Sequence, residues 1–380
     1  MPLTSKLPHV GTTIFTIMSK LAADHKAINL SQGYPDFNAH PKLIDLVSQY
    51  MGQGMNQYAP MQGVLRLRQR IAEKVKSFYG AEVDPEKEIT ITAGATEALF
   101  AAIMAVVQPN DEVIVVEPAY DAYVPTILLT YGKPVFVPLS FPEYRMDWDR
   151  VKDVLTERTR LIILNSPHNP SGTLLSEKDM QALQEIIEHF DLYILSDEVY
   201  EHIVFDGQRH QSMLRYPALA QKSLVVSSFG KTYHTTGWKI GYCIAPQRLT
   251  DELQKIHQFL TFTANTPIQL AYADFMSQHQ YYLELAQFYQ HKRDLFVNLM
   301  KSSRFTPLPC VGTYFQMMDY SAISNERDVD FARRLTTQHG VAAIPPSVFY
   351  HDHKDLKVVR FCFAKEDQTL TEAAERLCRI

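Results

Sequence analysis

The sequence predicts an α/β protein built on a mostly parallel sheet, and three observations support this fold class. The 380 residues are 46% hydrophobic and 21% charged, a composition typical of a globular protein. The middle of the chain alternates short apolar runs with segments of helical periodicity, the pattern of parallel strands joined by crossover helices. Repeats and low-complexity tracts are absent from the sequence.

Seven short apolar runs have the length and composition of buried strands. They are residues 88–92, 112–116, 133–138, 160–164, 192–195, 224–226 and 240–244. Helical patterns lie between them, for example over residues 96–107 and 148–156. The Ser176 hydroxyl is suited to cap a further helix over residues 177–190. The sequence therefore predicts a seven-stranded sheet covered by helices.

The pattern changes near residues 266–267, where long helical stretches replace the alternation. The segments expected after that point are helices within 267–301, strands at 313–317 and 357–363, and a terminal helix over 369–377. We therefore expect two domains. The large α/β domain spans residues 45–285, and a smaller α+β domain is built from residues 1–44 together with residues 286–380.

Charge and cysteine content narrow the class of protein. The 37 basic and 42 acidic residues give a net charge of -5, which does not indicate a basic surface for nucleic acid or an anionic membrane. The four cysteines follow no metal-site or disulfide spacing and indicate buried thiols in a reducing compartment. Neither an apolar signal core nor a membrane-length apolar run is present. We expect a cytoplasmic protein with no nucleic-acid or membrane partner.

Ligands of open α/β sheets bind at the carboxyl ends of the strands, so the residues after each predicted strand are candidates. Gly94, Ala95 and Thr96 follow the first run. A small-residue turn that opens a helix suits a phosphate, although an ordinary strand–helix turn has the same pattern. Tyr120 follows the second run, where its ring is suited either to stack on a planar ligand or to pack in the core.

Two later strand ends carry more specific groups. Asn165 begins a loop over residues 165–172 that contains two prolines and two asparagines, more rigidity than a turn requires. Asp197 ends an apolar strand, where a carboxylate needs a cation such as a protonated ring nitrogen unless it is simply exposed. Tyr200, three positions later, is suited to donate a hydrogen bond to an oxygen on the same ring.

The loop after residues 224–226 holds the candidate nucleophile, Lys231. This loop is small and polar, and a second cation, Lys239, follows eight positions later. A partly desolvated lysine near another cation has a lowered pKa and is a usable nucleophile, whereas a lone loop lysine is usually solvated. Ser228 and Lys239 are both suited to bind a phosphate.

Together these motifs resemble those of the fold-type I aminotransferases, which depend on pyridoxal 5′-phosphate (PLP). The shared pattern is Asn-x-Pro-x-Asn-Pro-x-Gly from Asn165, Ser-Asp-Glu-x-Tyr from Ser196, and Ser-x-x-Lys from Ser228. Further segments look like the branch of kynurenine, methionine and glutamine aminotransferases; they are residues 30–37, 56–58, 230–232, 236–239 and 359–363. The resemblance covers nearly the whole chain and implies the fold-type I architecture.

The resemblance also implies a role for each candidate toward PLP. Lys231 would hold the cofactor covalently and later move the proton between substrate and cofactor carbons. Asp197 would keep the ring nitrogen protonated, so that the ring withdraws electrons from the substrate. Asn165 and Tyr200 would hold the ring oxygen, and Tyr120 would stack on the ring. The implied phosphate ligands are Gly94, Ala95, Thr96, Ser228, Lys239 and, from the other subunit of a homodimer, Tyr58.

For the substrate, the resemblance implies that the Arg360 guanidinium binds the carboxylate through two hydrogen bonds. The other implied substrate contacts are Gly33, Tyr34, Phe15 and Asn165. Residues 259–266 contain no arginine, although dicarboxylate-specific members place a second carboxylate-binding arginine there. We therefore expect transamination between a 2-keto acid and a neutral hydrophobic or aromatic L-amino acid: methionine, phenylalanine, tyrosine, tryptophan or kynurenine. The implied homodimer has its active site at the subunit interface.

Other functions fit parts of the pattern. Ser228-x-x-Lys231 matches the start of penicillin-recognising acyl enzymes, but their other two motifs are absent. His351 and His353 lack a third metal ligand at useful spacing, so we expect no metal. A catalytically inactive protein on the same fold would lack Lys231 or Arg360. Cysteine-conjugate β-lyases share the scaffold and the lysine, so β-elimination stays open as the alternative to transamination.

Overall fold

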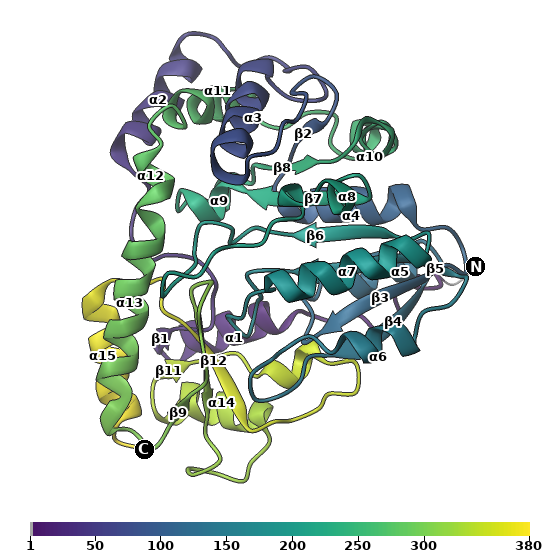
Figure 1. Cartoon of the computed structure of the whole chain (residues 1–380). Helices are drawn as coiled ribbons and strands as arrows, with labels where there is room; N and C mark the ends of the chain where they lie inside the picture. Colours follow the sequence, from purple (N-terminus) through teal and green to yellow (C-terminus); the bar gives the residue numbers. More distant parts are fainter. Residues whose placement is uncertain (1–2) are drawn as a thin grey trace.

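The structure, a computed structural model that describes residues 3–380, has a central sheet with helices on both faces. A smaller group of strands and helices lies beside the sheet and is formed by both ends of the chain (Figure 1). The strands of the central sheet are β2 (Ile89–Thr92), β3 (Glu112–Glu117), β4 (Lys133–Pro138), β5 (Thr159–Asn165), β6 (Tyr193–Asp197), β7 (Ser223–Ser228) and β8 (Gly241–Ile244). These seven strands match the seven predicted runs, which confirms the α/β class.

The strand order is β2-β8-β7-β6-β5-β3-β4, and only β8 runs antiparallel to its neighbours. The mostly parallel arrangement is therefore confirmed. The register places candidate residues side by side, because Asn165 at the end of β5 is paired with Asp197 at the end of β6. Gly241 at the start of β8 is paired with both Thr92 and Ser228, which brings the turn after β2 next to the end of β7.

The helices around the central sheet are α2 (Pro41–Gly52), α3 (Leu65–Tyr79), α4 (Ala95–Val106), α5 (Tyr123–Leu129), α6 (Trp148–Asp153), α7 (Glu177–His189), α8 (Pro217–Ala220), α9 (Phe229–Thr232), α10 (Gln247–Leu260) and α11 (Thr266–Phe275). Residues of α3, α7 and α11 form the core on one face of the sheet, and residues of α4, α5 and α10 form the core on the other. The predicted cap of α7 is confirmed: the Ser176 hydroxyl accepts from the Asp179 amide in a reciprocal capping box.

The remaining elements are α1 (Ile14–Asp24), β1 (Ile28–Asn29), α12 (Gln280–Leu283), α13 (Leu285–Leu299), β9 (Thr306–Pro307), β10 (Phe315–Asp319), α14 (Asp328–Gln338), β11 (Val341–Ala342), β12 (Val358–Cys362) and α15 (Asp367–Leu377). Short 3-10 helices lie at Met213–Arg215, Thr236–Trp238, Met300–Ser302 and Pro346–Phe349. Strands β12, β10 and β9 form an antiparallel sheet, and β1 pairs in parallel with β11.

A separate core joins the two chain ends. Met18 and Leu30 from the N-terminal part pack in one cluster with Phe331, Phe361 and Leu377. This packing agrees with a smaller unit built from both ends, while the exact boundaries given above, 45–285 against 1–44 with 286–380, stay a prediction. No helix within residues 3–380 combines the length and the apolar character needed to cross a membrane.

Candidate active site

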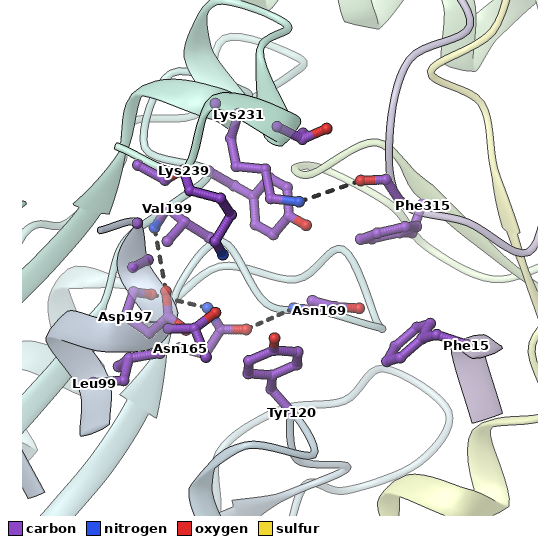
Figure 2. Close-up of a pocket in the computed structure, with 18 of the residues that line it drawn as sticks. Phe15, Leu99, Tyr120, Asn165, Asn169, Asp197, Val199, Lys231, Lys239 and Phe315 are labelled. Atoms are coloured by element: carbon purple, nitrogen blue, oxygen red, sulfur yellow. Dashed lines mark hydrogen bonds between the residues drawn. The ribbon is translucent and has the colours of Figure 1, made fainter. Parts of the chain in front are cut away.

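A cavity of about 270 Å³ lies where the carboxyl ends of β5, β6 and β7 meet the unit formed by the chain ends. Figure 2 shows Asp197 and Asn165 on one side of this space and Phe15 and Phe315 on the other. The predicted site residues that line it are Phe15, Gly33, Gly94, Ala95, Thr96, Tyr120, Asn165, Asp197, Tyr200, Ser228, Lys231, Lys239 and Arg360. The structure thus brings together thirteen residues that are scattered along the sequence.

The loop that carries Lys231 is held by close packing. It leaves β7 and forms the single helical turn α9. A Cβ atom on Gly230 would lie 2.9 Å from Cα of Thr236, so only glycine allows the two segments to approach this closely. The Phe229 ring stacks on the Tyr272 ring with centroids 4.5 Å apart and fixes the start of the turn.

The Lys231 amine points across the cavity rather than into bulk solvent. Its Nζ donates to the Gly33 carbonyl oxygen at 3.2 Å and to the Tyr314 hydroxyl at 2.9 Å. Burial, together with the neighbouring cations Lys239 and Arg360, lowers the pKa of Lys231 to about 8. About a tenth of the amine is therefore neutral at pH 7, and the neutral form is the one that acts as a nucleophile or base.

Asp197 is a buried carboxylate at the end of β6, with 4% of its surface exposed. It accepts hydrogen bonds from the Tyr123 hydroxyl at 2.7 Å and the Val199 amide at 3.4 Å. Burial raises the pKa of Asp197 to about 6. Asn165 is fixed beside it, because its amide nitrogen donates to the Asp197 carbonyl at 2.8 Å and its oxygen accepts from the Asn169 amide (Figure 2).

The turn between β2 and α4 suits an anion. Gly94 has φ +81°, a conformation that favours glycine, and a Cβ atom there would lie 3.1 Å from the Lys239 ammonium nitrogen. Gly241 is equally constrained, since its Cβ would lie 2.7 Å from the Ala95 amide nitrogen. Backbone N–H groups at the start of α4, the Ser228 side chain and the Lys239 ammonium thus border one part of the cavity.

Arg360 in β12 is completely buried. Its Nη1 donates to the Asn169 side-chain oxygen at 2.8 Å and its Nη2 to the Ser31 carbonyl at 2.9 Å, while Nε has no hydrogen-bond partner within residues 3–380. The guanidinium carbon lies 3.9 Å from the centroid of the Phe315 ring and 5.4 Å from that of Phe15. Burial lowers the pKa of Arg360 to about 10. A buried cation with uncharged partners is suited to bind an anionic ligand.

Gly33 lines the cavity and also allows close packing beside it. The space left by its missing side chain is filled by Phe315, whose ring carbon would lie 2.8 Å from a Cβ at this position. Its carbonyl oxygen accepts from Lys231 and from the Tyr314 hydroxyl. The residue therefore allows close packing of β10 against the N-terminal segment and also positions the amine.

Sequence reasoning missed several groups at the site: Ser31, Gln32, Tyr123, Asn169 and Tyr314. Asn169 belongs to the rigid loop that begins at Asn165, so the loop pattern could have identified it. Tyr123 lies three positions after Tyr120, at the start of α5. Tyr314 and Ser31 carry no local signal, because their role depends on how the chain ends pack.

Two predicted residues do not line this cavity. Tyr34 is 45% exposed and its carbonyl accepts from Lys365. Tyr58 is 84% exposed, with its ring 5.5 Å from that of Phe262. Phe262 belongs to residues 259–266, so this arginine-free segment also lies away from the cavity of its own chain.

His351 has a structural partner. His351 Nδ1 lies 2.9 Å from a carboxylate oxygen of Glu117, and its ring stacks on Phe136 at 4.2 Å. Within the described part of the chain, no three His, Cys, Asp or Glu side chains gather as metal ligands.

Comparison with known proteins identifies the family. Residues 25–377 match the family described as aminotransferase class I and II. The chain is 52% identical over 374 residues to a methionine aminotransferase from Escherichia coli, covering 98% of this chain and 97% of that protein. It is 34% identical over 411 residues to a kynurenine–oxoglutarate transaminase from Dictyostelium discoideum, covering 97% of this chain and 94% of that protein.

A solved structure gives the same result. The crystal structure of an Escherichia coli protein with methionine aminotransferase function superposes with a TM-score of 0.98 and 51% identity, and the match covers 100% of both chains. The resemblance expected from the motifs and the fold-type I architecture are therefore confirmed. The chain belongs to the class I and II aminotransferases.

Proposed function

We propose that this aminotransferase uses PLP to move the amino group of a neutral hydrophobic or aromatic L-amino acid, with methionine preferred, to a 2-keto acid. One observation carries the proposal. A single cavity contains a buried carboxylate, Asp197, and a buried guanidinium, Arg360, and both are held by uncharged groups. The Lys231 amine lies in the same cavity. A ligand with a cationic ring nitrogen at one end and a carboxylate at the other would match both charges.

The residues present fit PLP. Asp197 is available to pair with the ring nitrogen, and Tyr120 lines the cavity where a ring would stack. The glycine turn at Gly94 and the Lys239 ammonium are suited to the phosphate. When bound, PLP supplies a conjugated ring that withdraws electrons from the carbon bearing the amino group.

The chain's own groups would then hold the substrate and move its proton. Arg360 would bind the substrate carboxylate through two hydrogen bonds and so fix the orientation of the reacting carbon. Because the pKa of Lys231 is about 8, roughly a tenth of the free amine is neutral at pH 7 and can accept a proton at Nζ. Asn165 and Tyr200 line the cavity beside Asp197 and would hold the ring oxygen.

The preference for an uncharged side chain is supported by the lining of the cavity. Its lining cations within the described chain are Lys231, Lys239 and Arg360, and each has a proposed task. Phe15 and Phe315 lie against the guanidinium and offer aromatic surface to a substrate side chain. The relatives named for methionine and for kynurenine support the same class of amino donor.

We also propose a homodimer in which Tyr58 reaches the phosphate site of the partner subunit. Tyr58 is 84% exposed, and the neighbouring Phe259 and Phe262 are 86% and 44% exposed. Such a group of exposed aromatic rings is the kind of surface that an interface covers. A cytoplasmic location, expected from the sequence, stays a prediction.

A panel of amino donors tests the proposal. PLP-loaded enzyme is mixed with methionine, phenylalanine, tyrosine, tryptophan or kynurenine and a 2-keto acid, and keto-acid formation is measured; aspartate and glutamate are the matched charged donors. We expect methionine and the aromatic donors to exceed aspartate by about 100-fold in kcat/KM, since a dicarboxylate would leave a buried charge unpaired. Faster release of pyruvate and ammonia from cysteine conjugates than transamination of methionine would instead indicate a β-lyase.

A further inference from the structure

Tyr314 is a buried residue that contacts the candidate catalytic amine. It precedes β10 and has no exposed surface. Its ring packs edge-on against Tyr200, with centroids 5.1 Å apart, and against Phe315 at 4.9 Å. Its hydroxyl lies 2.9 Å from Lys231 Nζ and 2.6 Å from the Gly33 carbonyl oxygen.

The direction of each hydrogen bond follows from the chemistry of the three groups. A carbonyl oxygen only accepts, so the single Tyr314 hydroxyl proton is donated to Gly33. Toward Lys231 the hydroxyl can then act only as an acceptor. The amine therefore donates twice, once to Tyr314 and once to the Gly33 carbonyl at 3.2 Å.

Two donated bonds use both protons of a neutral amine. The fourth tetrahedral direction of Nζ, after Cε and these two protons, holds the lone pair. In the ammonium form the third proton occupies that same direction. The proton can therefore join or leave Nζ without rotation of the amine, which keeps the base oriented through each transfer.

We propose that Tyr314 is a positioning residue for Lys231: its hydroxyl and the Gly33 carbonyl hold two amine protons, so that the third position alone exchanges a proton with the substrate carbon. The proposal rests on the assignment of Lys231 as the catalytic amine. Tyr314 itself lies behind the amine and is not among the residues that line the cavity, so it acts through Lys231.

Other charged or titratable groups face Lys231 from every neighbouring element and must stay constant in a test. They are Asp197, Tyr200, Lys239, Arg360 and Cys362. Replacement of Tyr314 by phenylalanine leaves all of them in place and removes one oxygen atom. The matched control is Tyr289→Phe. The Tyr289 hydroxyl is also buried, has no hydrogen-bond partner among the residues that the structure describes, and belongs to a ring 5.6 Å from that of Tyr314.

The first measurement uses protein without cofactor. The rate at which cyanate modifies Lys231 is followed by peptide mass spectrometry as a function of pH, which gives the pKa of the amine. In Tyr314→Phe we expect this pKa to fall by about half to one unit. The Tyr314 oxygen stabilises the ammonium more than the neutral amine, and the variant lacks this acceptor. Site-specific 3-fluorotyrosine at position 314, a weaker acceptor that keeps the ring packing, should shift it the same way by less.

The second measurement uses the PLP-loaded enzyme. We expect Tyr314→Phe to lower kcat about 10- to 100-fold while KM changes less than about 3-fold, since substrate contacts are untouched. An unchanged Lys231 pKa and kcat in Tyr314→Phe, or equal changes in Tyr289→Phe, would overturn the proposal. Borohydride reduction of the PLP-loaded wild type separates failure of the proposed function from failure of the positioning role. Absence of PLP on Lys231 would refute the proposed function itself. Presence of PLP on Lys231, with the Lys231 pKa and kcat unchanged in Tyr314→Phe, would refute only the positioning role.

Discussion

The two sides of the cavity are built in different ways. On the Asp197 side, residues come from neighbouring strand ends whose register fixes them, as Asn165 beside Asp197 illustrates. On the Arg360 side, contacts join distant segments: the bond from Arg360 to the Ser31 carbonyl spans 329 positions of sequence. The first side is a property of one sheet, and the second depends on how the chain ends pack against that sheet.

This difference separates the two tasks of the proposed enzyme. The sheet side has the groups suited to the cofactor, whereas the side formed by the chain ends has the groups suited to the substrate carboxylate and side chain. Substitutions on the sheet side should therefore affect turnover of every donor. Substitutions of the groups on the other side that contact the substrate should affect substrate binding while the cofactor stays in place, whereas Tyr314 is expected to act through Lys231.

The largest expected effect is on the sheet side, in Lys231→Ala. This variant lacks the amine that we propose holds the cofactor and accepts the substrate proton, so we expect kcat to fall by about four or more orders of magnitude for all donors. Some cofactor should remain bound through the Gly94 turn and Lys239. Turnover of methionine and the cofactor content after dialysis are the measurements.

The matched control is Lys292→Ala. Lys292 is also a buried lysine, but it pairs with Asp367 at 2.9 Å outside the cavity. We expect lower thermal stability and nearly normal turnover in that variant. Near-normal turnover in Lys231→Ala itself would contradict the mechanism.

The next effect is on the opposite side, in Arg360→Lys. An ammonium cannot form two parallel hydrogen bonds to a carboxylate, so we expect kcat/KM to fall about 10²- to 10³-fold, mainly through KM, for all amino acids. The absorption of bound PLP should not change. Arg293→Lys is the control, because Arg293 binds both carboxylate oxygens of Asp206 and does not line the cavity. An altered PLP spectrum in Arg360→Lys would show that the two sides are not independent.

The difference between the two sides of the cavity also explains which site residues the sequence could predict. The seven strands were identifiable because buried parallel strands are continuous apolar runs, and strand ends then located Asn165, Asp197 and Lys231 without knowledge of tertiary contacts. Arg360 and Phe15 came only from the family resemblance, since neither position has a distinctive local pattern.

The rest was inaccessible for physical reasons. Tyr314 and Ser31 meet the site only after the N-terminal segment packs on β10 and β12, and no periodicity encodes that packing. Tyr58 and residues 259–266 were expected at the site but lie on the surface of their own chain. Their predicted contribution depends on contacts with a second subunit, which no pattern within one chain encodes.

The last expected effect concerns Asp197 in cofactor-free protein, and it measures the cost of burying this carboxylate without a cation beside it. The pKa of Asp197 is raised from 3.8 to about 6, so the folded protein holds this proton more tightly than the unfolded chain. Below about pH 4 the carboxyl is protonated in both states and does not destabilise the fold. As the pH rises toward 6 the unfolded chain loses this proton more readily, so the free energy of unfolding falls. A shift of about two units corresponds to about 3 kcal/mol.

We therefore expect the free energy of unfolding of the wild-type apoprotein to fall by about 3 kcal/mol relative to that of Asp197→Asn between about pH 4 and pH 7. The difference in unfolding midpoint between the two proteins is the measurement. Asp328→Asn is the control, because burial also raises the pKa of Asp328, which lies outside the cavity and is bonded to Ser347. Saturating PLP should abolish the Asp197 difference, since a cationic ring nitrogen stabilises the carboxylate, and should leave the Asp328 difference intact. If PLP left both differences unchanged, Asp197 would not contact the cofactor, and the division of the cavity into a cofactor side and a substrate side would fail.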